Sequence, residues 1–209
     1  MTIHTPKTRE ALARLLAPLR LESSVFERAV SVGAAESRTF SSGGPKSAPG
    51  YTRWARTVEA VHEDLMLLRL GWRRFDPDNL PYFLQPDLHL GFVVSSGDSH
   101  TGVTYGNPTN RNSKGAAFAR RVDQNGTAAM FGQPTDEGEV TVDDFRVLLY
   151  DERQGFVYLE LSRPDARVGD HVSHWSERII FPAFDLALGT FGFEEGNDEG
   201  DFGFKIARR

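Results

Sequence analysis

The stretch from Tyr51 to Leu68 constrains the fold most, because its apolar residues recur at the spacing of an α-helix. Steps of three and four residues place them on one stripe, and Gly71 follows as a residue that can end the helix. The stripe consists of Tyr51, Trp54, Val58, Val61, Leu65 and Leu68. Such stripes usually face a core, so the sequence predicts one long amphipathic helix packed on a sheet, with a partner-binding helix as the alternative.

The apolar period changes at Leu88. Every second residue from Leu88 to Val94 is Leu, Phe or Val, which is typical of a β-strand with one buried face. Strand-like segments follow, and the turn "DERQG" separates the last two of them, which predicts a β-hairpin. These further predicted strands cover residues 116–122, 127–131, 140–150 and 156–162.

Two more elements are predicted near the end of the sequence. The segment "HWSERIIFPAFDLAL", residues 174–188, predicts a late helix that is interrupted or restarted at Pro182, because proline has no N–H for a helix interior. Residues 190–206 predict two short aromatic strands around the acidic turn "EEGNDEGD". This turn lacks the spacing of a calcium-binding loop, so an exposed turn is the simpler interpretation.

The N-terminal part predicts two further helices. Thr5-Pro6 is typical of a helix start, and the helix that follows should end near Pro18. A second short helix should end before Gly33. Residues 41–50 are rich in Ser, Gly and Pro, which favours a flexible connection.

The order of these elements predicts the fold class and the domain organisation. Runs of helices before runs of strands favour α+β, with N-terminal helices and one long amphipathic helix packed on a mainly antiparallel sheet with a late C-terminal helix. The length of 209 residues suits one well-buried core with a helical appendage. We therefore expect an N-terminal helical segment at 1–40, a connection at 41–50 and a core domain at 51–209.

Composition excludes several classes of function. The sequence has no Cys, which removes disulfides, thiolate metal ligands and cysteine nucleophiles. The formal net charge of −5 disfavours generic attraction to nucleic-acid phosphates, although a local basic patch can still bind them. Neither a secretory signal nor an apolar run long enough for a membrane span is found, so a cytoplasmic location without membrane contact is expected.

The stretch "VVSSGDSHTG", residues 93–102, is the first candidate for a reaction site. An apolar strand gives way there to a polar loop, and loops at strand ends often hold functional side chains. Asp98 and His100 in this loop suit an acid–base pair or a metal site. Both residues are candidate catalytic residues, but they form a site only if other functional groups lie close to them in the fold.

His171 and His174 are the second candidate. Their spacing places both on one side of a predicted helical turn, with Glu177 further along, and two imidazoles with a carboxylate are a legitimate zinc set. The spacing matches no known zinc motif, which favours a capped helix start with exposed histidines. If the two histidines converge with Asp98 or His100, they become metal ligands and Glu177 becomes a candidate base.

A basic segment, "GNPTNRNSKGAAFARRV", is the third candidate. Its backbone amides and cations can hold a phosphate, although Lys and Gly stand in the wrong order for a P-loop. An exposed basic loop is the simpler interpretation. The candidate binding residues are Arg111, Lys114, Arg120 and Arg121.

Common enzyme signatures are absent from the sequence, which contains no G-x-S-x-G and no G-x-G-x-x-G after a strand. We therefore expect a non-enzymatic intracellular binding module without a cofactor, such as an inhibitor, immunity or regulatory protein acting on a protein or nucleic-acid partner. One alternative is a metal-dependent hydrolase or nuclease that uses the His/Asp cluster and a divalent metal. Another is a phosphate or nucleotide binder using Arg111, Lys114 and the loop at 95–102. Enzymatic activity stays an open question at this point.

Overall fold

The computed structural model describes residues 1–41, 43–76, 79–131, 142–186 and 190–191. The helices are α1 (Arg9–Leu16), α2 (Ser23–Ser37), α3 (Ala48–Leu68) and α4 (Ala116–Phe131), with short 3-10 turns at Ala17–Leu19 and Pro86–Leu88. The strands are β1 (Thr2–His4), β2 (Arg73–Phe75), β3 (Tyr82–Gln85), β4 (Leu90–Ser96), β5 (Asp144–Arg153), β6 (Phe156–Val168), β7 (His171–Ile180), β8 (Phe184–Asp185) and β9 (Thr190–Phe191).

One sheet organises the described residues. Its main path runs in the order β1-β7-β6-β5-β4-β3-β2, and the short strands β8 and β9 extend from β6. The pairs β1–β7 and β4–β5 are parallel, and the other pairs are antiparallel. The predicted α+β class with a mainly antiparallel sheet is therefore confirmed.

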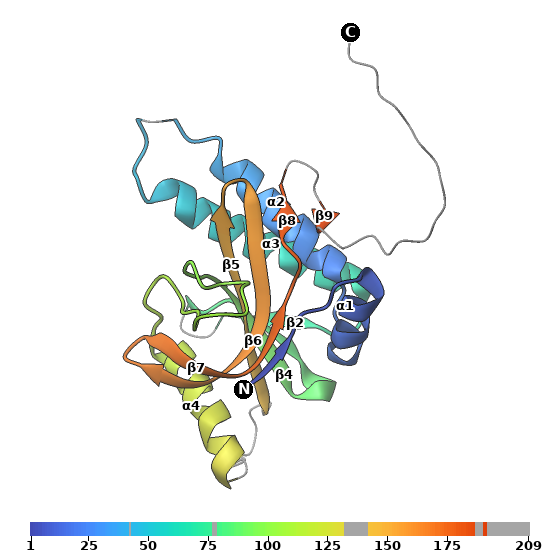
Figure 1. The fold of residues 1–209 in the computed structure, drawn as a ribbon. Coiled ribbons are helices and arrows are strands. Elements are labelled where there is room, and N and C mark those ends of the chain that lie inside the picture. Colours follow the sequence, from blue (N-terminus) through green and yellow to red (C-terminus); the bar gives the residue numbers. More distant parts are fainter. Residues whose placement is uncertain (42, 77–78, 132–141, 187–189, 192–209) are drawn as a thin grey trace, which may run out of the picture.

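Helices cover both faces of this sheet (Figure 1). Side chains of β4 point alternately to the two faces of the sheet. Phe92 and Val94 pack in the hydrophobic cluster that includes α1, α2 and α3, whereas Val93 packs in the cluster on the face that α4 covers. In β5, Leu148 and Leu149 divide between the two clusters in the same way. Two hydrophobic layers thus hold the sheet between the three N-terminal helices and α4.

The long helix is confirmed at α3, and it lies beside α2 (Figure 1). Val58, Val61 and Leu65 of the predicted stripe are buried, whereas Tyr51 at its start is 67% exposed. The two helices approach closely at Gly33, where a Cβ would collide with the Thr57 hydroxyl and would lie 2.6 Å from the carbonyl oxygen of Arg53. The prediction that this helix ends before Gly33 is wrong, because Gly33 lies inside α2, which continues to Ser37.

The predicted strands at 116–122 and 127–131 are wrong, because both segments belong to α4. Phe118, Val122 and Asn125 are buried at helical spacing. Asn125 donates to the carbonyl oxygens of Phe145 and Pro164 and accepts from the N–H of Phe145, which ties the helix to β5 and β6. Because Asn125 is polar, the sequence shows only Phe118 and Val122 as apolar core positions, which is too short a pattern to indicate a helix.

The predicted late helix is also wrong over residues 174–180, which belong to strand β7. Val172, Trp175 and Arg178 are buried three residues apart, which resembles a helical spacing. The reason is an irregular register between β6 and β7, which interrupts the alternation of the strand. Most of the predicted aromatic pair at 190–206 lies outside the described residues, and only Thr190–Phe191 is seen, as β9.

The predicted hairpin is confirmed as β5 and β6, joined through Gln154 and Gly155 in left-handed conformations. The first helix begins at Arg9, because the Thr8 hydroxyl accepts from the N–H of Ala11 and caps it. Its predicted start at Thr5-Pro6 is therefore too early by a few residues. None of the helices in the described ranges has both the length and the hydropathy needed to cross a bilayer.

Candidate functional site

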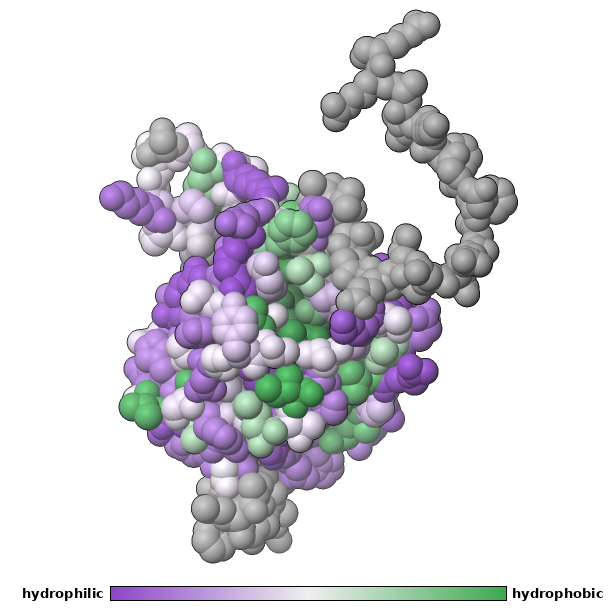
Figure 2. Space-filling model, viewed as in Figure 1, coloured by the Kyte–Doolittle hydropathy of each residue, from purple (hydrophilic) through white to green (hydrophobic). Residues whose placement is uncertain are grey.

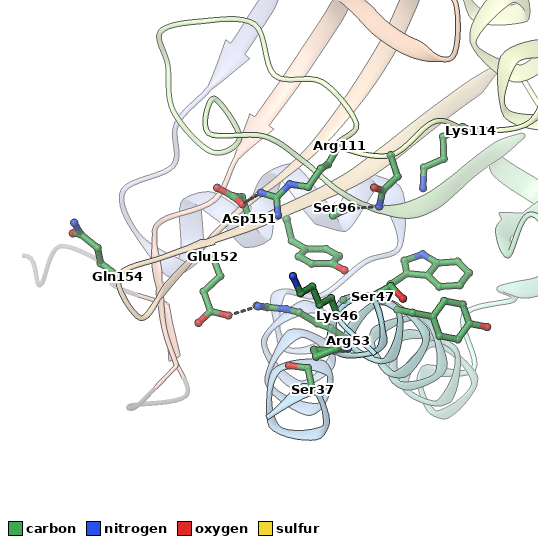
Figure 3. A pocket seen from close by; sticks show the side chains of 16 residues that line it. Ser37, Lys46, Ser47, Arg53, Ser96, Arg111, Lys114, Asp151, Glu152 and Gln154 are labelled. Atoms are coloured by element: carbon green, nitrogen blue, oxygen red, sulfur yellow. Dashed lines mark hydrogen bonds and ion pairs between the residues drawn. The ribbon is translucent and has the colours of Figure 1, made fainter. Parts of the chain in front are cut away.

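A cleft of about 770 Å³ opens where the N-terminal end of α3 faces the ends of β4 and β5. Its volume lies in the range typical of small-molecule sites, which is roughly 300 to 1,000 Å³. Figure 3 shows the polar side chains around it. The lining residues come from the end of α2, the segment 46–54, the end of β4, the loop 111–114 and residues 150–154.

The sheet contributes the carboxyl ends of its parallel pair. Ser96, the last residue of β4, lies opposite Tyr150 of β5 in the parallel register. The N–H of Gly97 donates to the Tyr150 carbonyl at 2.8 Å, and the N–H of Arg111 donates to the Ser96 carbonyl at 2.9 Å. The chain leaving β4 therefore returns to the same edge and brings Arg111 to the cleft. Ligands of open α/β sheets commonly bind beyond the carboxyl ends of parallel strands.

The helical wall begins at Ser47, the N-cap of α3. The Ser47 side chain makes no capping hydrogen bond, and Pro49 occupies the first turn. Ser47, Pro49 and Gly50 all line the cleft. Ala48 already donates its N–H to the Pro45 carbonyl and Pro49 has no N–H, so it is the helix macrodipole that makes this wall electropositive.

Ion pairs order the acidic side of the cleft. Arg111 donates to the buried carboxylate of Asp151, and Arg53 donates to Glu152 (Figure 3). Arg153 also lies 3.3 Å from the Asp151 carboxylate. The Arg53 side chain is 14% exposed, and its Nε and Nη2 are buried without a hydrogen-bond partner among the described residues. Both carboxylates are thus neutralised, while Arg53 keeps donor capacity.

Lys114 differs from these arginines, because no hydrogen bond or ion pair joins its ammonium group to another described residue. The side chain is half-buried and lines the cleft. Burial lowers the pKa of Lys114 below its ordinary value. A half-buried cation without a counter-charge is costly, and an anionic ligand would relieve that cost.

Tyr150 forms part of the floor. Burial raises the pKa of its phenol to about 12, against the opposing effect of the positive charges of Arg53 and Arg111. The Arg53 guanidinium lies 5.4 Å from the ring centroid. Tyr150 is therefore neutral at physiological pH and offers the cleft an aromatic surface.

This shift predicts a pH dependence of stability. In the unfolded chain the phenol ionises near its ordinary pKa of about 10. Between about pH 10 and 12 the folded protein keeps a proton that the unfolded chain loses, so the free energy of unfolding falls as pH rises, by about 2 kcal/mol. Denaturant titrations at several pH values should detect the fall. A Tyr150→Phe variant lacks the group and should lose this component; an identical pH profile in the variant would contradict the assignment.

The structure brings together two of the four predicted binding residues. Arg111 and Lys114 line the cleft. Arg120 and Arg121 lie on α4, which covers the opposite face of the sheet, and they are absent from the lining. Arg121 instead lies over the ring of Tyr82, with its guanidinium carbon 5.5 Å from the centroid.

Asp98 and His100 lie close to each other, in the loop that follows Ser96. The Asp98 carboxylate accepts from the N–H of His100 at 3.0 Å, and its other oxygen lies 3.6 Å from the His100 Nδ1. Neither residue lines the cleft. Asp98 stabilises the local turn by this contact, which is a common role for aspartate in loops.

The candidate metal ligands have separate partners. His171 Nδ1 lies 2.8 Å from the carbonyl oxygen of Asn110, and His174 Nδ1 lies 2.6 Å from the Asp165 carboxylate. Glu177 accepts from Arg146 at 2.6 Å and lies 3.1 Å from the ring of His4. Within the described ranges, no three His, Cys, Asp or Glu side chains are grouped to hold a metal ion.

The helical half of the cleft was missed by sequence reasoning. Lys46, Tyr51, Arg53 and Trp54 all line it, yet the sequence predicted a connection at 41–50 and placed Tyr51 and Trp54 on the stripe that packs on the sheet. The signal was a helix start in "KSAPG", where Pro49 stands two residues after Ser47. Comparison of the chain with protein-family models, with curated proteins and with solved structures gives no match.

Proposed function

We propose that this protein binds a small anionic ligand, a phosphate or a phosphate ester, in the cleft between α3 and the carboxyl ends of β4 and β5. The observation that carries the proposal is the excess of cations. Four cationic side chains line the cleft against two carboxylates, in a chain whose formal net charge is −5. The cations are Lys46, Arg53, Arg111 and Lys114.

The arrangement of charge supports an anion at one end of the cleft. Asp151 and Glu152 lie together at one side of the view, each paired with an arginine, and Lys114 lies at the other side (Figure 3). An anion beside Lys114 and the start of α3 avoids the two carboxylates. It also receives charge-assisted hydrogen bonds, which are stronger than bonds between neutral groups.

Two other functions stay predictions. A binding module for a protein or nucleic acid needs a broad surface, and on the face drawn in Figure 2 the hydrophobic residues lie in patches interrupted by hydrophilic ones. A metal-dependent hydrolase needs converging ligands, yet Asp98 and His100 contact each other, whereas His171 contacts Asn110 and His174 contacts Asp165. Neither has an observation as specific as the charged cleft in its favour.

Lys114→Met tests the proposal directly. The change keeps the length of the side chain and removes its charge, so the affinity for pyrophosphate and for phosphate esters should fall about tenfold or more, since hydrogen bonds to charged groups contribute about 1.5 to 3 kcal/mol. Isothermal titration calorimetry measures the affinities. Lys7→Met, an exposed lysine outside the cleft, is the matched control and should bind as the wild type does. Failure of the wild type to bind any of these anions would refute the proposal.

Gly50→Asp separates binding from folding. A Cβ at Gly50 meets no atom within 4 Å, and a carboxylate in the first turn of a helix stabilises it by about 0.3 to 1 kcal/mol. The variant should therefore be as stable as the wild type or slightly more so, yet bind pyrophosphate about tenfold more weakly, because the new charge repels the ligand. Gly50→Ala is the control and should keep full affinity. Equal affinity of the aspartate variant and the wild type would exclude an anion at this end of the cleft.

A further inference from the structure

The aromatic side chains of the cleft point to a narrower ligand class. We infer that the anion is a phosphate ester that carries a flat aromatic ring, a nucleotide, and that the ring stacks on Tyr51 beside Trp54. This inference rests on the proposed function. It identifies the organic part of the phosphate ester as one that carries an aromatic base.

Tyr51 is the first observation. It lines the cleft and is 67% exposed, although it begins the stripe whose later members Val58, Val61 and Leu65 are buried. Burial of the helix on the sheet therefore leaves the Tyr51 ring uncovered. An uncovered aromatic ring on a cleft wall is a surface on which another flat ring can stack, and stacking of a base on an aromatic side chain contributes about 1 to 3 kcal/mol.

Trp54 holds a second ring beside it. The ring centroids of Tyr51 and Trp54 are 5.7 Å apart, and the planes are tilted by 51°. The indole N–H donates to the carbonyl oxygen of Val94 at 3.0 Å, which fixes the orientation of the Trp54 ring against β4. The pair thus has one fixed member and one exposed member, and no ordering of Trp54 is needed when a ligand binds.

The spacing along α3 fits a nucleotide. Tyr51 lies one helical turn after Ser47, so the aromatic pair begins about 6 Å along the axis from the electropositive start of the helix. A sugar separates the phosphate from the base in a nucleotide by a comparable span. The side chains of Ser96 and Asn112 also line the cleft, and the Asn112 amide, which donates to the Ser96 hydroxyl at 3.4 Å, still offers its oxygen to a sugar hydroxyl.

A comparison of adenosine monophosphate with ribose 5-phosphate isolates the ring. Both carry the same phosphate and sugar, and only the first carries a base. The wild type should bind adenosine monophosphate about tenfold more tightly than ribose 5-phosphate. This ratio corresponds to the lower part of the free-energy range for stacking of one base, about 1 to 3 kcal/mol. Tyr51→Ala should remove most of this preference and leave the affinity for ribose 5-phosphate unchanged. Tyr105→Ala, which removes a 73% exposed tyrosine outside the cleft, should keep the preference.

Fluorescence gives an independent readout. The chain has three tryptophans, and Trp72 and Trp175 are 3% and 0% exposed, so Trp54 is the one that lines the cleft. Stacking of a base should quench the emission of the wild type and not that of Trp54→Phe, whereas ribose 5-phosphate should quench neither. Equal affinities for the two ligands in the wild type would overturn the inference and leave the proposed function standing. Absence of binding by both ligands and by pyrophosphate would overturn the inference together with the proposed function.

Discussion

Replacement of Glu160 by glutamine should lower the free energy of unfolding by about 3 to 5 kcal/mol, the cost typical of leaving one partner of a buried ion pair uncompensated. Glu160 and Arg178 are both fully buried, with Arg178 Nη2 at 2.5 Å and Nε at 3.1 Å from the carboxylate oxygens. The carboxylate also accepts from the N–H of Gly102 and the Ser162 hydroxyl. The neutral amide leaves the guanidinium charge in the core without its counter-charge.

The pair also positions the loop after β4. Arg178 donates to the carbonyl oxygen of Val103 at 2.9 Å, so loss of the pair should loosen the loop that leads to Arg111. Denaturant unfolding measures the stability, and hydrogen exchange of residues 97–110 measures the loop. Glu177→Gln is the matched control and should cost less, because Glu177 is 28% exposed and its partner Arg146 keeps the Asp144 carboxylate at 2.9 Å as a counter-charge. Equal losses in the two variants would show that burial does not govern the effect.

Phe26→Ala should also destabilise the protein by about 3 to 5 kcal/mol, the range for a large aromatic side chain removed from a core. Phe26 of α2 is 0% exposed, and its ring lies 5.5 Å from that of Phe181 and 6.5 Å from that of Phe92 in β4. The residue therefore joins the N-terminal helices to the sheet. The exposed Phe40→Ala, at 40% exposure, should cost much less.

This variant also tests the predicted division into residues 1–40 and 51–209. The buried residues of α1 and α2 belong to the same hydrophobic cluster as those of β4, which leads us to expect a single unfolding transition. Circular dichroism and tryptophan fluorescence should then give coincident curves in the wild type and in Phe26→Ala. Separate transitions would instead support an N-terminal segment that folds independently of the core.

The fold was predictable where each signal lay within one segment. The stripe of α3 and the alternation of β4 follow from burial on one face, which local periodicity reports. The helix α4 was missed because Asn125 takes a core position through three hydrogen bonds that no periodicity reveals. Strand β7 resembles a helix in the sequence because its irregular register with β6 interrupts the alternation, and the buried Arg178 adds a charged residue to its core face.

The candidate site was predictable only in part. Arg111 and Lys114 stand close together in the sequence, so their composition marked them. The other wall comes from Lys46 to Trp54, and the floor from Tyr150, which the fold brings together over about half the chain. These segments come together because α3 packs on the sheet and because the loop after β4 folds back to place Arg111 beside Ser96. No property of a single segment encodes this arrangement.

The parallel pairing of β1 with β7 affects how the protein can be made. His4 and Glu177, which contact each other, are 173 residues apart in the chain. During synthesis β1 has no partner until almost all of the described sequence has left the ribosome, and contacts between distant residues form slowly because a long loop must close. Completion of this edge of the sheet is therefore a late event in folding, and a chain still short of β7 carries β1 as an open strand that can pair with a neighbour.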